Sequence, residues 1–397
     1  MTKVLLLVAD GMGDWPLEEL DGKTPLEAAY TPNMDGMATK SRVGLCQTIP
    51  AEMPAGSDIA NMTLLGYDPA RYHTGRGPIE AVAMDLQIGE EDLVWRCNLV
   101  ELSGLTPSGR MLDYAGGHID TREAAGLIQS LQAKLQNQEF SLYPGVQYRH
   151  LMVQRQGART KAAELDITPP HDLLDQEIGR DIEAYRAYPP LWEIVREAAR
   201  VLEGESRGTN TKYIWPWGQG KALRLPSFLE KFSLQGSVIS AVDLVKGLGR
   251  AAGLRVVDVP GATGLLDTNY QGKFQAAGRS LQEGDFVLLH LEGPDECGHM
   301  GAIQDKMEAI ARFDREIVGP LLQHLRGEDF VMVVCCDHLT PIKLRTHARD
   351  PIPFMIYDSQ GESPGPRAFS EKEAAGTSLF LEHGFEILPL ALKRARL

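Results

Sequence analysis

The chain has 397 residues, of which 43% are hydrophobic, 24% charged and 7% aromatic, so disorder, collagen and coiled coil are excluded as descriptions of the whole. We expect two domains, because one hydrophobic core stops growing at roughly 250–300 residues. With 40 basic and 54 acidic residues the net charge is −14, which disfavours nucleic acid and anionic membrane as partners but allows a local basic pocket for a small anion.

Short apolar runs alternate with helix-like stretches outside the middle of the chain. This alternation is typical of βαβ units on a mostly parallel sheet. Strands buried on both faces are expected to be continuous apolar runs. We predict strands at residues 4–9, 255–259, 286–291, 331–336 and 354–357, and helices at 58–66, 240–252 and 306–325.

The middle of the chain has a different pattern. It combines predicted strands at 93–102 and 146–155, a helix at 121–135 and a proline-bearing loop at 168–172. We therefore predict an α/β fold in which a smaller α+β unit is inserted into the sheet domain. The approximate boundaries assign 105–180 to the insert, and 1–104 and 181–397 to the sheet domain. The glycine-rich segment 204–220 is predicted to be a connecting loop.

The sequence also suggests a compartment. No apolar run reaches the ~18 residues that a membrane helix needs. The apolar stretch 4–9 meets Asp10 too early for the core of a signal peptide. The cysteines form no CxxC pair, so we expect a reduced, cytoplasmic protein. They are Cys46, Cys97, Cys297, Cys335 and Cys336.

Acidic and histidine residues follow three of the predicted strands. In open α/β sheets, ligands bind at the carboxyl ends of the strands, so these side chains are expected to converge on one edge. Asp295 and His299 are spaced i,i+4, which places a carboxylate and an imidazole on one side of a helical turn. The candidates are Asp10, Asp295, His299, Asp337, His338 and, nine residues further on, His347.

This combination of oxygen and nitrogen ligands predicts a metal site. It suits Mn²⁺, Zn²⁺ or Fe²⁺ better than Ca²⁺. Taken singly, each aspartate could instead be a turn residue or helix N-cap, and each histidine a surface residue. Their joint position at the ends of neighbouring strands favours the metal site.

Ser57, in Ala55-Gly56-Ser57-Asp58, is a candidate nucleophile that the metal site could activate. It stands at the predicted start of a helix, where free backbone N–H groups favour an anion. A hydroxyl becomes a good nucleophile when a metal lowers its pKa. The alternative is that Ser57 is only an N-cap, and spacing alone favours that alternative.

These motifs resemble the alkaline phosphatase superfamily. More closely, the chain resembles the archaeal-type, cofactor-independent (2,3-bisphosphoglycerate-independent) phosphoglycerate mutases, which also occur in bacteria. The resemblance covers nearly the whole chain. It rests on GSDIANMTLLGYDP (56–69), GRGPIEA (75–81), RCNLV (96–100), AGGHIDTREA (115–124), VDVPGATGLLDTNY (257–270) and the segment 337–353.

The resemblance implies an alkaline-phosphatase-like sheet with an inserted cap, and two divalent ions. Mn²⁺ is expected, with Zn²⁺ or Mg²⁺ as alternatives, and 2,3-bisphosphoglycerate is not required. Ser57 would become phosphoserine during interconversion of 3-phosphoglycerate and 2-phosphoglycerate, a step of glycolysis and gluconeogenesis. One ion would be held by Asp10, Ser57, Asp337 and His338, and the other by Asp295, His299 and His347.

A small phosphorylated substrate also needs groups for its phosphate and carboxylate. Arginine forks suit both anions. Each candidate arginine could instead be a surface charge or a structural ion pair, and the histidine an ordinary loop residue. The candidates are Arg76, Arg96, Arg149 and His118.

Other functions remain open from the sequence. TPPHD (168–172) and IWPWGQG (214–220) look more like a bacterial branch proposed to act as a homoserine kinase. A related phosphotransferase or a phosphatase would use the same metal ligands and Ser57. A catalytically idle metal-binding protein is a further alternative, against which the intact set of candidates argues. The oligomeric state is not predicted.

Overall fold

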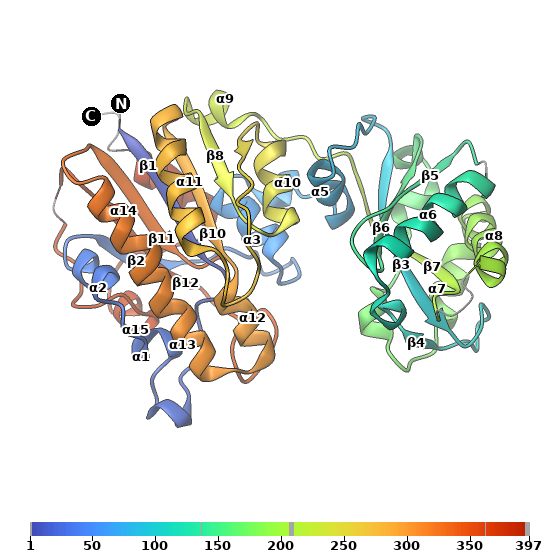
Figure 1. The fold of residues 1–397 in the computed structure, drawn as a ribbon, viewed down its shortest axis with the longest axis horizontal. Coiled ribbons are helices and arrows are strands. Elements are labelled where there is room, and N and C mark those ends of the chain that lie inside the picture. Colours follow the sequence, from blue (N-terminus) through green and yellow to red (C-terminus); the bar gives the residue numbers. More distant parts are fainter. Residues whose placement is uncertain (1, 136, 206–209, 362, 394–397) are drawn as a thin grey trace. The chain divides into compact units, whose positions relative to one another are not determined.

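The computed structural model describes residues 2–135, 137–205, 210–361 and 363–393. The chain divides into two compact units. Unit 1 comprises residues 1–73 and 224–397, and unit 2 comprises residues 74–223 (Figure 1). None of the described helices combines the length and the apolar character needed to cross a membrane.

Unit 1 contains, in its described part, an eight-stranded sheet of order β13-β2-β12-β11-β1-β10-β8-β9. Its strands are β1 (Lys3–Ala9), β2 (Arg42–Cys46), β8 (Gly236–Ile239), β9 (Arg255–Val256), β10 (Phe286–Leu291), β11 (Phe330–Cys335), β12 (Ile352–Asp358) and β13 (Phe380–Leu381). β12 runs antiparallel to both of its neighbours, and the other paired strands are parallel. The mostly parallel sheet expected from the apolar runs is confirmed.

Helices pack around this sheet, and Figure 1 shows α11, α13 and α14 lying across its front. The unit 1 helices are α1 (Pro25–Ala28), α2 (Pro32–Ala38), α3 (Ser57–Leu64), α4 (Pro69–Tyr72), α9 (Phe228–Phe232), α10 (Asp243–Ala251), α11 (Tyr270–Glu283), α12 (Gly293–Met300), α13 (Ile303–Arg312), α14 (Gly319–His324), α15 (Glu371–Ala375) and α16 (Ile387–Leu392). The single helix predicted at 306–325 is instead α13 and α14 joined by a π-helical turn, Phe313–Val318.

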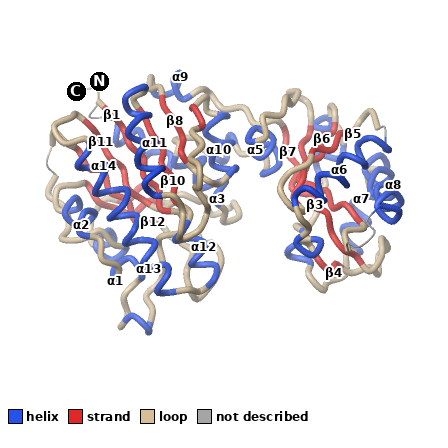
Figure 2. The backbone as a smooth tube through the Cα atoms, in the orientation of Figure 1, coloured by secondary structure: helices blue, strands red, loops and turns tan. Residues whose placement is uncertain are grey.

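Unit 2 is built on an antiparallel sheet of five strands, with β3 at its centre (Figure 2). The strands are β3 (Leu93–Leu102), β4 (Met111–Asp113), β5 (Phe140–Tyr143), β6 (Arg149–Gln154) and β7 (Tyr213–Lys221), and the helices are α5 (Arg76–Ala83), α6 (Thr121–Leu135), α7 (Gly179–Arg186) and α8 (Pro189–Glu205).

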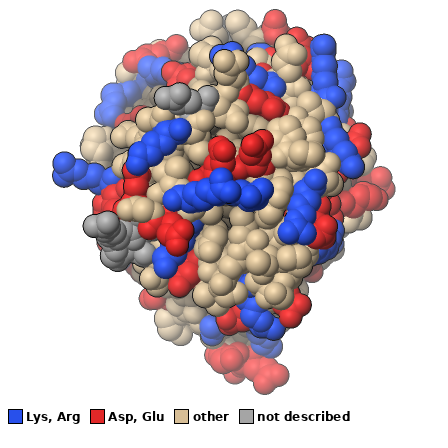
Figure 3. All heavy atoms as spheres, turned by 90° about the vertical axis from the view of Figure 1, so that its right-hand side faces the viewer, with Lys and Arg blue, Asp and Glu red and all other residues tan. Residues whose placement is uncertain are grey.

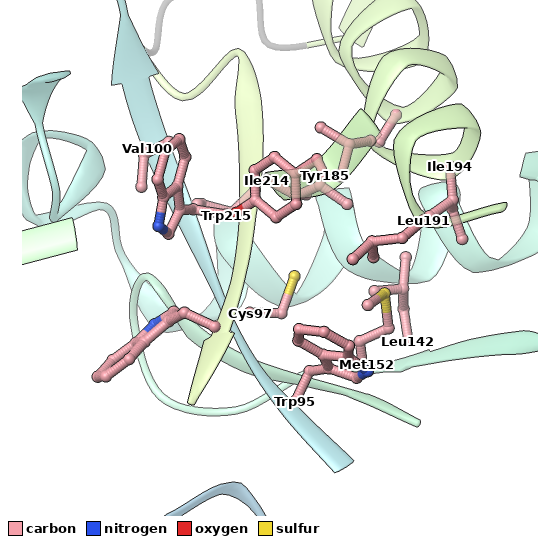
Figure 4. Close-up of a cluster of buried hydrophobic side chains, with 14 of the residues drawn as sticks. Trp95, Cys97, Val100, Leu142, Met152, Tyr185, Leu191, Ile194, Ile214 and Trp215 are labelled. Atoms are coloured by element: carbon pink, nitrogen blue, oxygen red, sulfur yellow. The ribbon is translucent and has the colours of Figure 1, made fainter. Parts of the chain in front are cut away.

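Unit 2 has its own hydrophobic core, which Figure 4 shows around Trp95 and Trp215. The Tyr185 ring lies 5.3 Å from Trp215, edge to face, and the Tyr185 hydroxyl donates to the Pro216 carbonyl at 2.8 Å. A separate buried core, with the polar tip of its tyrosine satisfied, is what an independently packed unit requires.

The borders of this unit lie farther out than the predicted 105–180. β3 pairs with β7 from Leu93↔Lys221 to Val100↔Tyr213, so both strands belong to the same unit. The prediction that 204–220 is a connecting loop is wrong for its second half, which is β7, while residues 206–209 lie outside the described part. Glycine in β7 has a steric cause: a Cβ at Gly220 would lie 1.7 Å from the Thr74 carbonyl oxygen.

Candidate metal centre and nucleophile

The predicted metal ligands follow three neighbouring strands of unit 1. β1 lies between β10 and β11 and is parallel to both, so the three carboxyl ends meet at one edge of the sheet. Asp10 directly follows β1. α12, which carries Asp295 and His299, begins two residues after β10. Asp337 and His338 follow β11 after one intervening residue.

Asp10, Asp337 and His338 form the first cluster of possible ligands. His338 Nε2 lies 3.5 Å from Asp10 Oδ1 and 3.5 Å from Asp337 Oδ2. The Ser57 hydroxyl lies 3.0 Å from the same His338 nitrogen. These separations fit one ion, because ligand atoms about 2.1 Å from a metal stand about 3.0 to 3.4 Å from one another.

The second cluster is formed by Asp295, His299 and His347. His299 Nε2 lies 3.2 Å from Asp295 Oδ2, and His347 Nε2 lies 3.6 Å from Asp295 Oδ1. The two histidine Nε2 atoms are 3.1 Å apart. His338 joins the clusters, since its ring lies 4.0 Å from that of His347 and it also groups with Asp295 and His347.

The donor set fits divalent cations, and a buried atom without a partner supports this. Asp10 Oδ1 has no hydrogen-bond partner among the described residues. Burial, followed by repulsion from Asp337 and Asp295, raises the pKa of Asp10 well above its usual range. A cation between these carboxylates would remove that repulsion.

In the second cluster, contacts between Asp295 and the histidines shift the pKa values of Asp295 and His299. The hydrogen bond and charge of Asp295 raise the pKa of His299 to about 9. Burial opposes ionisation of Asp295, but His299 and His347 outweigh burial and hold the pKa of Asp295 well below its usual range. A divalent ion would replace these protons as the positive partner of Asp295.

Ser57 is not the N-cap of its helix. Gly56 is the N-cap, no side chain caps the helix, and Ser57 is the first helical residue. The capping alternative is therefore wrong, and the hydroxyl instead faces His338. One turn later, the Asn61 side chain donates to Asp337 Oδ2 at 2.7 Å. α3 thus aims both a hydroxyl and an amide at the first cluster.

Two supporting residues are not among the predicted site residues. Asn61 is one, and Thr340 is the other: its hydroxyl donates to Asp295 Oδ1 at 2.5 Å and lies 3.2 Å from His338 Nδ1. Thr340 thus contacts one residue of each cluster. Asparagine and threonine side chains are so common in other roles that only the folded geometry identifies them.

The predicted anion-binding residues all lie in unit 2, and Arg96 is the most firmly held of them. Its side chain is buried, donates to Glu80 Oε2 at 3.1 Å, and stacks 4.5 Å above the Trp217 ring. Arg76 reaches the same carboxylate at 3.7 Å. Burial lowers the pKa of Arg96, which Glu80 opposes and the charges of Arg76 and Arg149 reinforce.

Arg149 and His118 both lie near another aromatic ring, that of Tyr148. The Arg149 guanidinium lies 5.4 Å from the Tyr148 ring, and the His118 ring lies 6.3 Å from it. His171, which is not among the predicted candidates, packs edge-on against Trp217 at 5.6 Å. Aromatic rings beside arginines fix the guanidinium planes without using their N–H groups.

Unit 2 also has a mixed surface. On the face in Figure 3, lysines and arginines stand among aspartates and glutamates. An anion meeting this face would find local groups of cations instead of a continuous basic area.

Comparisons with known proteins find relatives that match nearly the whole chain. A family model described as 2,3-bisphosphoglycerate-independent phosphoglycerate mutase matches residues 38–206. The chain is 43% identical to the mutase of that name from Methanosarcina barkeri, covering 98% of this chain and 99% of the relative. It is 42% identical to a probable mutase of that name from Geobacter sulfurreducens, covering 99% and 100%.

Two solved structures share the fold. One is a protein from Pyrococcus horikoshii, with a TM-score of 0.83 and 29% identity, covering 99% of this chain and 97% of that one. The other is a cofactor-independent phosphoglycerate mutase from Thermoplasma acidophilum, with a TM-score of 0.67 and 26% identity over the full length of both chains.

Proposed function

The chain belongs to the family of 2,3-bisphosphoglycerate-independent phosphoglycerate mutases, and we propose that it interconverts 3-phosphoglycerate and 2-phosphoglycerate through a phosphoserine formed on Ser57. The observation that carries this proposal is the position of the Ser57 hydroxyl. It does not cap its helix, and it lies 3.0 Å from His338 Nε2 beside a cluster of possible metal ligands. The comparisons favour this reaction over that of a related phosphotransferase.

Each possible metal ligand has a proposed place. Asp10, Ser57, Asp337 and His338 would hold one ion, and Asp295, His299 and His347 would hold the other. When bound, two such ions lower the pKa of a hydroxyl and neutralise charge on the attacking and leaving oxygens of an in-line displacement. Mn²⁺ is the proposed metal, with Zn²⁺ and Mg²⁺ as alternatives.

The proposed reaction has two balanced transfers. The Ser57 oxygen forms a bond to phosphorus while the bond from phosphorus to the 3-oxygen of the substrate breaks, and the serine proton ends on that oxygen. Glycerate then reorients, and its 2-oxygen forms a bond to phosphorus while the bond from phosphorus to the Ser57 oxygen breaks. The proton of the 2-hydroxyl passes to the Ser57 oxygen. A helix N-terminus favours an anion, so the start of α3 favours the phosphoryl group next to Ser57.

Unit 2 would hold the rest of the substrate. Arg76, Arg96, Arg149 and His118 are the proposed contacts for its phosphate and carboxylate, supported by the shared Glu80 and the aromatic rings that fix the guanidinium groups. An enzyme acting on such central metabolites is proposed to work in the cytoplasm.

We expect Arg96→Lys to lower kcat/KM by about 10- to 100-fold, because lysine keeps the charge but loses the planar fork and the stacking on Trp217. Steady-state kinetics with 3-phosphoglycerate measure this change. The matched control is Arg159→Lys, because Arg159 pairs with Glu91 on the exposed surface of unit 2. The kcat/KM of this control variant should stay within about twofold of wild type. An unchanged kcat/KM in Arg96→Lys would remove Arg96 from the substrate site.

The proposed reaction is tested with purified, Mn²⁺-loaded protein and 3-phosphoglycerate, without 2,3-bisphosphoglycerate. We expect 2-phosphoglycerate to form, detected through enolase coupling. Parallel samples measure inorganic phosphate release, and phosphorylation of homoserine by ATP. Phosphate release without 2-phosphoglycerate would support a phosphatase, and phosphohomoserine alone would support the kinase.

A further inference from the structure

A chain of buried charges lies directly behind the first metal cluster and takes no part in the proposed reaction. Lys273 on α11 is fully buried, as is His290 on β10, and Glu292 is 2% exposed. Lys273 Nζ donates to Glu292 Oε2 at 2.6 Å and to the His290 carbonyl at 2.9 Å. Burying three ionisable side chains is costly unless they are fixed in mutual contact.

Glu292 is held by more than the lysine. Its Oε1 accepts from the Ser240 hydroxyl at 2.8 Å and from the Ala241 amide at 2.7 Å, and lies 3.3 Å from His290 Nδ1. Burial alone would raise the pKa of Glu292, but His290 and Lys273 hold it well below its usual range. Ionised carboxylates only accept hydrogen bonds, and they face His290 at both ring nitrogens, so Nδ1 and Nε2 both carry protons and can both donate.

The other nitrogen of His290 points at the metal cluster. His290 Nε2 lies 3.5 Å from Asp10 Oδ2 and 4.0 Å from Asp337 Oδ2, and it makes no hydrogen bond to any of the described residues. β10 and β1 are hydrogen-bonded neighbours with His290 opposite Val8, so the backbone register sets this approach.

The two oxygens of Asp10 consequently have different surroundings. Oδ2 faces His290, whereas the unpartnered Oδ1 faces His338, 3.5 Å away, in the first metal cluster. A carboxylate that ligates a metal through one oxygen is commonly oriented by a hydrogen bond to the other.

We propose that His290, clamped by Glu292 and Lys273, is a positioning residue that holds Asp10 Oδ2 and thereby presents Asp10 Oδ1 to the first ion. This inference rests on the metal site of the proposed function, and it adds three residues that are not among the predicted site residues. Side chains that orient ligands typically change metal affinity by about 10- to 100-fold when they are removed.

The test compares Mn²⁺ binding by the full chain without substrate, with free Mn²⁺ followed by its electron paramagnetic resonance signal. We expect His290→Leu to bind one of the two ions about 10- to 100-fold more weakly. His290→Gln can place an amide N–H near the position of Nε2, and we expect it to bind this ion more tightly than His290→Leu does. Glu292→Gln leaves His290 less firmly fixed, so this variant should also bind that ion more weakly than wild type does.

His150→Leu is the matched control. His150 is a buried histidine of unit 2 whose Nε2 also lacks a described partner, so its loss should leave both Mn²⁺ affinities unchanged. Circular dichroism shows which variants are folded, and Glu292→Gln carries the test if His290→Leu is not.

The proposal is overturned if folded His290→Leu, or Glu292→Gln in its place, binds both ions as wild type does. It is also overturned if His290→Gln loses as much affinity as His290→Leu, because the donor at Nε2 would then be irrelevant. Since no substrate is present, the outcome is separate from that of the proposed function. A protein that binds two ions but forms no 2-phosphoglycerate would contradict only the reaction.

Discussion

Ser57→Ala should lower mutase activity by at least about 10⁴-fold, since removing a nucleophile leaves only the residual effects of binding and electrostatics. The variant should still fold, because the Ser57 hydroxyl caps nothing and alanine is a better helix former than serine. Its melting temperature should therefore match that of wild type. The assay follows 2-phosphoglycerate formation at saturating 3-phosphoglycerate, with thermal unfolding recorded on the same preparations.

Ser227→Ala provides the opposite control. Ser227 is the true N-cap of α9, where its hydroxyl accepts from the Glu230 amide at 3.2 Å in a capping box. Its removal should cost about 1 kcal/mol of stability while leaving turnover unchanged. Ser57→Ala with wild-type turnover would contradict the assignment of the nucleophile and revive the idle metal-binding alternative.

Removing the metal should have an effect of comparable size. After exhaustive chelation we expect activity to fall by at least about 10³-fold, because nothing then lowers the pKa of the Ser57 hydroxyl or neutralises the transferred group. Adding Mn²⁺ back should restore turnover. Metal analysis of the reloaded protein should give two ions per chain.

The Asp337→Asn variant distinguishes the two proposed ion sites, because Asp337 belongs to only one of them. Asp337 Oδ1 accepts from the Gly11 and His338 amides at 3.1 and 2.9 Å, and its Oδ2 accepts from Asn61, so the side chain is fixed in place before any ion binds. The variant should retain one ion and lose turnover. Asp314→Asn is its control: Asp314 is a buried aspartate that accepts from the Met34 amide at 2.6 Å, and its variant should bind two ions. Full activity in the chelated wild type would contradict the two-ion mechanism.

The sheet of unit 1 could be predicted because its strands are continuous apolar runs. β10 was predicted with its exact bounds, and β1 and β11 to within one residue at each end. The convergence of Asp10, Asp295 and Asp337 could be predicted because these residues come soon after such strands, and parallel pairing brings the strand ends together. β7 was missed because Pro216, Gly218 and Gly220 are typical of a loop, although pairing with β3 accommodates them.

The supporting residues could not be predicted, because their roles arise from contacts between distant segments. Lys273 and Glu292 are separated by 19 positions, and Thr340 reaches Asp295 across 45. A lysine on a helix is ordinarily exposed. Only the folded chain shows that Lys273 is fully buried against a carboxylate.

The central claim is that the phosphoryl group passes through Ser57. The direct measurement is to quench Mn²⁺-loaded protein with acid during turnover of 3-phosphoglycerate and to map phosphorylation by peptide mass spectrometry. We predict phosphate on Ser57 in the wild-type protein and none at this position in Ser57→Ala. Turnover to 2-phosphoglycerate with Ser57 unmodified, or with phosphate on another residue, would contradict the proposed mechanism.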